Sequence, residues 1–481
     1  MAGLAHLVEM AQVGLSDQIA RPRIAIIGGG YAGMAAAVSL MDTGIADLTV
    51  YEAGPILGGR ARRIPGGNGD EDNGQHLCLG AYTELLKLMG RVGADPEDLF
   101  YRCPLSLLIH ALNHPLGKKS KSLFSLRTIR FLPAPLNLAT SILLSSGTSL
   151  GERVHTLQAL YQLKQQSYLI SPGLTVSQLC DELGIQGVFR HFFWESLCLA
   201  ALNTPPQFAC AQTFLNILQD IAEGHQQASN FLIPRTDLSS LFPEPAAQYI
   251  QKKGAKVYTS CAIKQCEPAG KLIRVVGTRH HSLYHHVILA TPPRAASTLI
   301  NGWGEPMHDL GNQLRSLPHE KIATLSVEYS NRRFRLPFPM MGIAHSPIEW
   351  IVDRSYLLQQ SSAKRLKDSS ASDTHGSRFT CVISAPHESS NLDKGFLTSE
   401  AHACLQSLCG PLPQPNASRL VVEKFATLSC RPDIHRPQAC TPDPRLILAG
   451  DYLQSRYPST LETAVRSGLS AAALTIKHMQ A

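Results

Sequence analysis

One glycine-rich stretch near the N-terminus constrains the fold more than any other part of the chain. Residues 24–27 are four consecutive apolar residues, and three glycines follow directly. This pattern predicts a buried parallel strand, a tight turn and the start of a helix. In such a unit Gly28 permits the turn, Gly30 lets a pyrophosphate approach the backbone, and Gly33 lets the helix lie close to the strand. The stretch therefore predicts a strand–turn–helix unit that binds a dinucleotide.

An acidic residue at the end of the next strand strengthens this interpretation. Residues 48–52 read as a strand that ends in Glu52, nineteen residues after Gly33. A carboxylate about 20 residues beyond the glycines is placed to bind a ribose hydroxyl. The N-terminus of the helix would present free N–H groups to the phosphates. The alternative is a glycine-rich turn without a ligand.

Length and composition limit the remaining possibilities. The chain has 481 residues, so we expect two or three substructures rather than one core. Its net charge of +7 comes without a dense basic stripe, which does not suggest a nucleic-acid partner. The 12 cysteines form no C-x-x-C pair, and residues 1–20 lack a secretory signal. We expect a cytoplasmic protein with reduced cysteines, no spanning helix and no metal site.

One segment raises the possibility of peripheral contact with the inner face of a membrane. Five cations precede two apolar runs, residues 131–136 and 142–144, and no acid occurs from residue 118 to residue 150. The cations are Lys118, Lys119, Lys121, Arg127 and Arg130. A basic and apolar segment can lie in a membrane interface. The same pattern also fits a core-packing helix with a solvated basic entrance.

The rest of the chain alternates between two kinds of region. We assign residues 22–100, 241–300 and 421–476 to a discontinuous dinucleotide-binding domain. Residues 101–240, expected to be mostly helical, and residues 301–420 form a second, largely apolar domain. Residues 1–21 read as an extension and 359–378 as a flexible excursion. An aromatic-rich helix ends at Pro205 and suits either a large hydrocarbon substrate or plain core packing.

Two further segments carry a family resemblance. Residues 58–61 read Gly-Gly-Arg-Ala, and residues 450–451 read Gly-Asp before a predicted helix. These resemble the amine oxidase and phytoene desaturase flavoproteins, in which the first pattern lies along the FAD pyrophosphate. Residues 73–76, 194–195, 201–206, 232–235 and 431–432 resemble the narrower hydroxysqualene dehydroxylase family, also described as squalene-associated FAD-dependent desaturases. The resemblance covers nearly all of residues 22–476. Residues 452–459 and Thr463 differ from the residues that this family usually has at those positions.

The resemblance implies an α/β fold: a Rossmann-like FAD-binding domain of the two-dinucleotide-binding type, with an interleaved α+β substrate domain. It implies FAD-dependent reductive loss of the hydroxyl group of hydroxysqualene, which gives squalene for hopanoid supply. Partners would be this isoprenoid, an unidentified electron donor and upstream synthases of the squalene/phytoene type. A carotenoid-type desaturase is the second possibility, and a non-catalytic prenyl-lipid escort protein is the third.

The site residues follow from the motifs and the resemblance together. The expected cofactor-binding residues are Gly28, Gly30, Tyr31, Ala32, Gly33, Glu52, Gly58, Gly59, Arg60, Gly74, Ile263, Gly450, Asp451, Thr460, Leu461 and Thr463. Loss of hydroxide requires a proton donor. His76 is the first candidate, Gln75 would orient the hydroxyl, and Glu195 and Asp72 are weaker candidates. His76 can equally be a structural histidine bonded to the backbone.

Overall fold

The computed structural model describes residues 21–64, 71–112, 122–129, 131–278, 280–305, 307–330, 334–357 and 376–480. The predicted N-terminal extension lies outside these residues, except for its last position. Most of the excursion predicted at 359–378 also lies outside them, and its last two residues open a strand. Four of the five cations in the basic segment, all except Arg127, are outside the described residues as well.

A five-stranded parallel sheet forms the centre of the first domain. Its strand order is β18-β12-β1-β2-β8, with every neighbouring pair parallel. The strands are β1 (Arg23–Ile27), β2 (Asp47–Tyr51), β8 (Lys256–Tyr258), β12 (His286–Leu289) and β18 (Leu446–Leu448). Three regions far apart in the chain therefore build one sheet, and their carboxyl ends share one edge, where ligands of such sheets bind.

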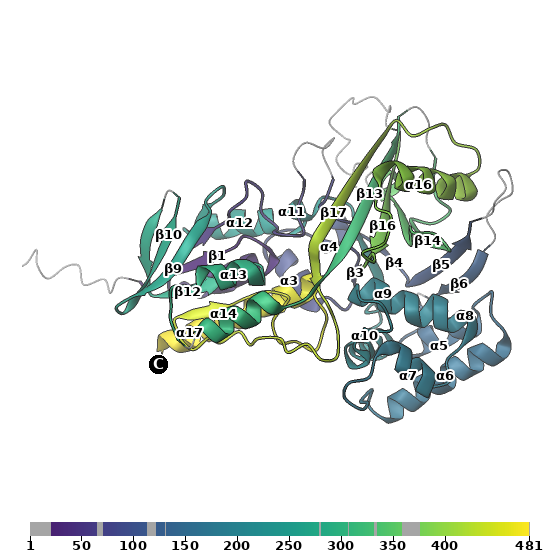
Figure 1. The fold of residues 1–481 in the computed structure, drawn as a ribbon, viewed down its shortest axis with the longest axis horizontal. Helices are drawn as coiled ribbons and strands as arrows, with labels where there is room; N and C mark the ends of the chain where they lie inside the picture. Colours follow the sequence, from purple (N-terminus) through teal and green to yellow (C-terminus); the bar gives the residue numbers. More distant parts are fainter. Residues whose placement is uncertain are drawn as a thin grey trace, which may run out of the picture.

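Both faces of this sheet are covered, as its nearly continuous apolar strands require. Ile24 and Ile26 pack against one helical layer: α2 (Tyr31–Thr43), α3 (Thr83–Arg91), α12 (Pro243–Lys252) and α17 (Leu461–Gln480). Ala25 and Ile27 face the other layer. That layer holds α13 (Pro293–Leu299), α14 (Met307–Ser316) and a hairpin sheet of β9 (Ile263–Ala269), β10 (Leu272–Gly277) and β11 (His281–Tyr284). Figure 1 shows this domain beside a second sheet.

The second domain contains a seven-stranded sheet in the order β17-β13-β16-β15-β14-β5-β6. Its strands are β5 (Ser106–Ala111), β6 (Ser122–Arg127), β13 (His319–Tyr329), β14 (Met340–Ala344), β15 (Trp350–Asp353), β16 (Ser377–Ser384) and β17 (Ala417–Leu428). Neighbours are antiparallel except for β14 and β5. α16 (Lys394–Cys409) packs on one face (Figure 1).

A helical group packs against the other face of the seven-stranded sheet. It consists of α5 (Leu136–Leu143), α6 (Leu150–Gln165), α7 (Val176–Glu182), α8 (Gly187–Phe189), the π-helix η1 (Arg190–Glu195), α9 (Ser196–Leu202) and α10 (Ala211–Glu223). A small sheet of β3 (Cys78–Leu79), β7 (Phe231–Pro234) and β4 (Phe100–Cys103) lies between the domains, with α4 (Pro96–Leu99) and α11 (Leu238–Leu241) beside it. The apolar cores of both domains include residues of this small sheet.

The structure corrects three sequence-based boundaries. Residues 101–127 contain β4, β5 and β6 rather than helices, because their apolar residues pack in a sheet register. β17 stays paired with β13 up to Leu428, so residues 421–428 belong to the substrate-side sheet. α11 already belongs to the cofactor domain before residue 241, because Leu238 is buried there and its carbonyl accepts from the Tyr31 hydroxyl at 2.8 Å.

Candidate cofactor cleft and active site

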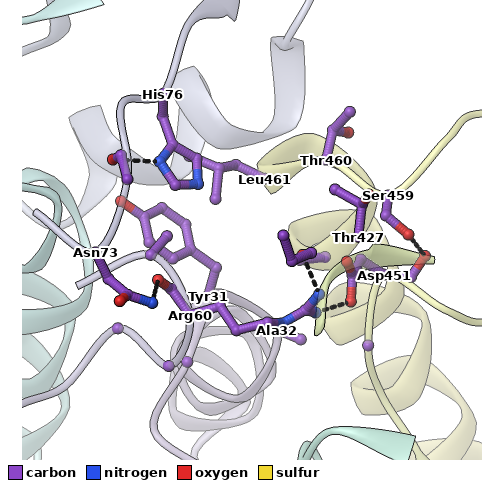
Figure 2. A pocket seen from close by; sticks show the side chains of 18 of the residues that line it. Tyr31, Ala32, Arg60, Asn73, His76, Thr427, Asp451, Ser459, Thr460 and Leu461 are labelled. Atoms are coloured by element: carbon purple, nitrogen blue, oxygen red, sulfur yellow. Dashed lines mark hydrogen bonds and ion pairs between the residues drawn. The ribbon is translucent and has the colours of Figure 1, made fainter. Parts of the chain in front are cut away.

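A single large cavity, about 940 Å³ in volume, extends from the carboxyl edge of the parallel sheet into the second domain. Most of the predicted site residues line it. They are Gly28, Gly30, Tyr31, Ala32, Glu52, Gly58, Gly59, Arg60, Gly74, Gln75, His76, Ile263, Gly450, Asp451, Thr460 and Leu461. Figure 2 shows His76, Thr460 and Leu461 along one side of the pocket, with Arg60 and Asp451 along another.

The glycine turn has the geometry that its sequence predicts. Gly28 has a φ of +113°, and a Cβ there would lie 2.3 Å from the carbonyl oxygen of Ala290. Gly58 donates its N–H to the carbonyl of Gly29 at 2.9 Å, and the backbones of Gly30 and Gly58 form a bridge. The Gly-Gly-Arg segment therefore lies directly beside the first glycine loop.

Glu52 follows β2 and faces the same cleft. One carboxylate oxygen accepts from Gly29 N at 2.8 Å, and the other accepts from Gly54 N at 2.8 Å. Each oxygen retains a second lone pair. The two backbone amides thus fix the carboxylate in the position where the sequence predicts a ribose hydroxyl.

Gly33 and Thr463, both in the expected cofactor set, do not line the cavity, and Gly33 has the helix-packing role that its motif predicts. A Cβ on Gly33 would lie 2.0 Å from the Gly28 carbonyl oxygen, so this glycine permits α2 to pack against the turn. The buried hydroxyl of Thr463 donates to the carbonyl of Pro458 at 2.7 Å. Its backbone N–H donates to Thr460 Oγ1 at 3.1 Å, which caps the start of α17.

Arg60 connects the two ends of the cofactor domain. Its guanidinium forms an ion pair with Asp451, beyond β18, and donates to the Ala426 carbonyl at 2.7 Å. The Asn73 amide donates to the Arg60 carbonyl at 3.1 Å and to the Glu423 carboxylate at 2.9 Å. The cleft is thus closed by a network that includes the second domain.

The residues present fit FAD on observations that do not depend on motif matching. The hydroxyls of Thr291 and Tyr452 are buried without a hydrogen-bond partner, and both residues line the cavity. A buried unpaired hydroxyl costs free energy that a bound polar ligand can recover. The glycine turn leaves backbone N–H groups at the start of α2 for a pyrophosphate. Thr291 and Tyr452 escaped sequence reasoning, although each follows a parallel strand whose carboxyl end predicts ligand contact.

His76 and Gln75 lie on the cavity wall, but their hydrogen bonds refine their expected roles. Nδ1 of His76 lies 3.1 Å from the Gly74 carbonyl, which can only accept. In the neutral ring Nδ1 therefore carries the proton and Nε2 presents a lone pair. Burial lowers the pKa of His76, and the charge of Arg60 also lowers it, against a hydrogen bond to Gly74 that raises it. The Gln75 amide donates to the His76 carbonyl at 2.9 Å.

The structure speaks against Glu195 and Asp72 as catalytic residues. Neither lines the cavity. Glu195 ends η1 and its two carboxylate oxygens accept from Arg190 Nε and pair with His191 Nδ1, each at 2.9 Å. Asp72 accepts from the backbone of Leu238 at 2.8 Å, which holds the start of α11. Both acids therefore stabilise local structure.

The far part of the cavity is mainly apolar. It is lined by residues of β5, β14, β15, β16, α9 and α10, and these include Leu107, Met340, Trp350, Val352, Val382, Leu197, Leu199, Ala200 and Ile217. Asn203, Ser384, Glu423 and Thr427 add polar groups at the end of the sheet. The aromatic residues Phe193 and Trp194 are buried in the core and do not line the cavity. For this pair, plain core packing is the interpretation that holds.

Metal and membrane-spanning sites are absent from the part of the chain that the structure covers. No group of three or more His, Cys, Asp or Glu side chains there could hold a metal ion. No helix built from these residues has the length and apolar character needed to cross a bilayer.

Comparisons with known proteins agree with this architecture. Hydroxysqualene dehydroxylase of Zymomonas mobilis is 24% identical over 479 residues, 94% of this chain and 99% of the relative. Zeta-carotene desaturase of Synechocystis is 23% identical over 497 residues, 94% of this chain and 96% of the relative. The structure of cyclohexylamine oxidase from Brevibacterium oxydans superposes with a TM-score of 0.63 at 15% identity, covering 96% of this chain and all of that one.

The family model for flavin containing amine oxidoreductases matches residues 31–476. This match starts at the first helix after the glycine turn and ends within α17. It therefore includes every cofactor segment after that turn and both chain segments that build the second domain. FAD is the cofactor that this family and the cleft have in common. The chain therefore belongs to the flavin containing amine oxidoreductases and is an FAD-dependent oxidoreductase.

Proposed function

We propose that this oxidoreductase removes the hydroxyl group of hydroxysqualene reductively and releases squalene and water. The observation that carries the proposal is the continuity of the cavity, which runs from the FAD cleft into walls made mainly of apolar side chains. Such walls suit a long isoprenoid hydrocarbon with few polar atoms. The similarity to hydroxysqualene dehydroxylase over almost the full length of both chains supports the same substrate class.

In this proposal, the apolar wall and the polar residues of the cavity have separate roles. When bound, reduced FAD supplies the hydride. The alcohol is allylic, so protonation and loss of water leave a delocalised cation at the carbon that receives the hydride. The apolar wall excludes water, which would otherwise add back to the cation. His76 in its neutral form presents Nε2 as an acceptor and orients the substrate hydroxyl, and Gln75 holds the His76 backbone carbonyl.

A carotenoid-type desaturase is the second candidate, and the similarity to zeta-carotene desaturase favours it over other oxidases. That reaction would remove hydride from a polyene precursor and needs no proton donor to a leaving hydroxide. A prenyl-lipid escort protein without catalysis is the third candidate. The cleft with unpaired Thr291 and Tyr452 hydroxyls argues against it, because a protein that never binds FAD gains nothing from them.

The deciding experiment is a single turnover without oxygen. Purified holoenzyme is reduced, mixed with hydroxysqualene, and followed by flavin absorbance and by product analysis. We expect flavin reoxidation and squalene formation at equal rates and in equal amounts. No reoxidation by hydroxysqualene, together with bleaching of the oxidised holoenzyme by a phytoene-like substrate, would replace the proposal by a desaturase. A colourless protein after FAD reconstitution would revive the escort protein.

We also propose cytoplasmic residence with peripheral contact at the inner face of the membrane, where a water-insoluble substrate dissolves. Eight of the twelve exposed large apolar residues of the described chain fall between residues 131 and 169: Phe131, Leu136, Leu143, Leu144, Leu150, Val154, Tyr161 and Leu169. On α6, Leu150, Val154 and Tyr161 follow helical spacing and share a face. The substrate would come from an upstream synthase of the squalene/phytoene type, and an unidentified electron donor would reduce the flavin.

A further inference from the structure

The polar end of the substrate cavity contains a proton path that no sequence motif indicates. We propose that the Ser384 hydroxyl delivers the proton to the leaving oxygen, and that Glu349 behind it orients Ser384 and replaces its proton. This inference rests on the proposed reductive dehydroxylation and identifies the acid that it requires. The proton donor is then a residue of the second domain rather than His76.

Strand register places Ser384 on the cavity wall close to the cofactor network. Ser384 ends β16 and pairs with Ile322 on β13, which in turn pairs with Glu423 on β17. Directly opposed residues in antiparallel strands point to the same face, roughly 5 Å apart. All three line the cavity. Glu423 accepts from Asn73 at 2.9 Å, and Asn73 donates to the Arg60 carbonyl, so the row begins at the cofactor cleft.

Asn203 fixes the loop that carries Ser384. It caps α9 in the left-handed conformation, with a φ of +46°. Its side-chain carbonyl accepts from Ala385 N at 2.9 Å, and its amide donates to Thr427 Oγ1 at 3.0 Å and to the Lys321 carbonyl at 3.2 Å. One amide therefore ties the residue after Ser384 to β13 and β17. This hydrogen bond fixes the backbone directly after Ser384 and so holds Ser384 in place on the cavity wall.

Glu349 reaches the cavity only through Ser384. It precedes β15, does not line the cavity itself, and accepts the Ser384 backbone N–H at 3.1 Å. Burial raises the pKa of Glu349 to about 7, while hydrogen bonds from the side chain and backbone of Ser384 lower it in part. The half-buried carboxyl group therefore keeps its proton to a higher pH than an exposed glutamate does. On the neighbouring elements, His345 after β14 and His387 beyond β16 are exposed, and Cys381 on β16 is buried with a raised pKa.

The proton balance of the step is complete. The Ser384 hydroxyl proton moves to the substrate oxygen, the C–O bond breaks, and water and an allylic cation form. In the same event the Glu349 proton moves to Ser384 Oγ, so Ser384 relays the proton without becoming an alkoxide and Glu349 is left as the carboxylate. Bound reduced FAD would supply the hydride for the new C–H bond, and its two electrons would reduce the substrate carbon. A solvent proton restores Glu349 before the next turnover.

Other acids on the cavity wall are less suitable. The neutral His76 ring presents a lone pair rather than a proton to the cavity. The Tyr457 hydroxyl donates to the Asp220 carboxylate at 2.7 Å, so its proton is already engaged, and the group behind it is an acceptor that does not replace a proton given to the substrate. Glu423 accepts hydrogen bonds from Asn73 and from Phe425 N, so both of its oxygens are engaged as acceptors.

The test uses FAD-loaded protein in single turnovers with hydroxysqualene, over roughly three pH units centred on the Glu349 pKa of about 7. Wild type must reoxidise its flavin and form squalene; failure here overturns the proposed function itself. Given that result, Ser384→Ala should slow reoxidation by on the order of 10²-fold, the usual contribution of a positioned acid. Its flavin content and substrate affinity should match wild type. Ser384→Thr, which keeps the hydroxyl, should recover most of the rate.

Glu349→Gln supplies the readout that a merely structural role would not change. Wild type should lose rate as the pH rises through about 7, because Glu349 loses its proton there. Glu349→Gln should be slower at low pH and lack this alkaline decline. Ser399→Ala and Glu400→Gln, on α16 and outside the cavity, are matched controls and should behave like wild type. Wild-type rates in Ser384→Ala, or an unchanged alkaline decline in Glu349→Gln, would overturn the proton path. If Ser384→Ala fails to fold, Ser384→Thr and the Glu349→Gln profile still decide it.

Discussion

Arg60 and Asp451 stand 391 positions apart in the chain and form an ion pair at the cofactor cleft. Arg60 belongs to the Gly-Gly-Arg segment near the N-terminus, and Asp451 follows the last strand of the parallel sheet. The Asp451 side chain is only 10% exposed. Because the pair is largely removed from water, it holds both ends of the chain around the FAD site more effectively than a surface pair would.

Removing the carboxylate of Asp451 should weaken FAD binding. Loss of a charged hydrogen bond costs roughly 1.5–3 kcal/mol, so we expect Asp451→Ala to raise the Kd for FAD by about one to two orders of magnitude. Flavin absorbance per protein and fluorescence titration of the apoprotein measure this. Asp47→Ala removes an exposed acid of the same domain and should leave both values unchanged. Equal FAD affinity in Asp451→Ala and wild type would contradict a role at the cofactor.

Gly33 should tolerate no side chain, although it does not touch the cavity. A Cβ there would lie 2.0 Å from a backbone oxygen of the glycine turn, so α2 must shift. Overpacking of this kind typically costs 1–3 kcal/mol. We expect Gly33→Ala to lower Tm by several degrees and to reduce FAD content. Gly90→Ala, in α3 with no atom within 4 Å of the added carbon, should keep or raise Tm. A Gly33→Ala protein as stable as wild type would exclude the close contact.

Local patterns picked out residues that the structure gathers around one cavity, because each of these segments is encoded in a few consecutive residues. The turn at Gly28, the acid at Glu52 and the Gly450–Asp451 pair are strand ends followed by short loops. Once the strands are recognised, their parallel arrangement brings these residues to one edge of the sheet. The motif itself predicts the packing role of Gly33, but the sequence could not reveal that Thr463 serves capping, since it lies next to residues that line the cavity.

The substrate half resisted prediction because its residues meet only through long-range register. Ser384, Ile322 and Glu423 come from three strands separated by long segments, and none lies in a motif. The sequence pattern places β5 and β6 in a helical region. Their apolar runs are short, and the strand that joins them to the rest of the sheet, β14, lies far along the chain. The aromatic segment before Glu195 suggests that this acid faces the substrate. In η1, however, its carboxylate pairs with Arg190 and His191.

His76 should control the acid side of the pH profile. Its pKa lies below the usual 6.5, so the ring is neutral above that value and gains a proton as the pH falls through its lowered pKa. Protonation removes the Nε2 acceptor, and we therefore expect the wild-type rate to fall toward low pH. His76→Phe should slow turnover at normal flavin content, since it lacks the acceptor at every pH. His76→Gln retains a carbonyl acceptor and should keep more activity without the acid decline. Unchanged turnover in His76→Phe would exclude the role.

Ala200 should mark the route by which substrate enters. It lines the cavity and is exposed, and we expect it to lie near an opening. Ala200→Trp should raise KM for hydroxysqualene at least tenfold, while flavin content stays normal because the residue is remote from the glycine turns. Ala417→Trp places the same side chain at an exposed position outside the cavity and serves as the control. Equal KM values in the two variants would place the entrance elsewhere.

The exposed apolar residues in and directly around α5 and α6 should attach the protein to anionic membranes. Phe131, Leu144 and Leu150 are 85%, 73% and 68% exposed, although full burial of such a side chain is worth roughly 1.5–3 kcal/mol. Replacing all three by serine should weaken co-sedimentation with phosphatidylglycerol vesicles by at least tenfold. Neutralising Lys118, Lys119, Lys121, Arg127 and Arg130 should remove most of the remaining salt-sensitive binding.

The control for this surface is a pair of apolar residues exposed elsewhere. Leu283 and Phe396 are each 39% exposed and lie on β11 and α16, away from the two helices. Their replacement by serine should leave vesicle binding intact. If the triple variant and the cation-neutralised variant both sediment like wild type, this surface does not bind lipid. The protein would then need another way to obtain a substrate that is insoluble in water, such as direct transfer from an upstream synthase.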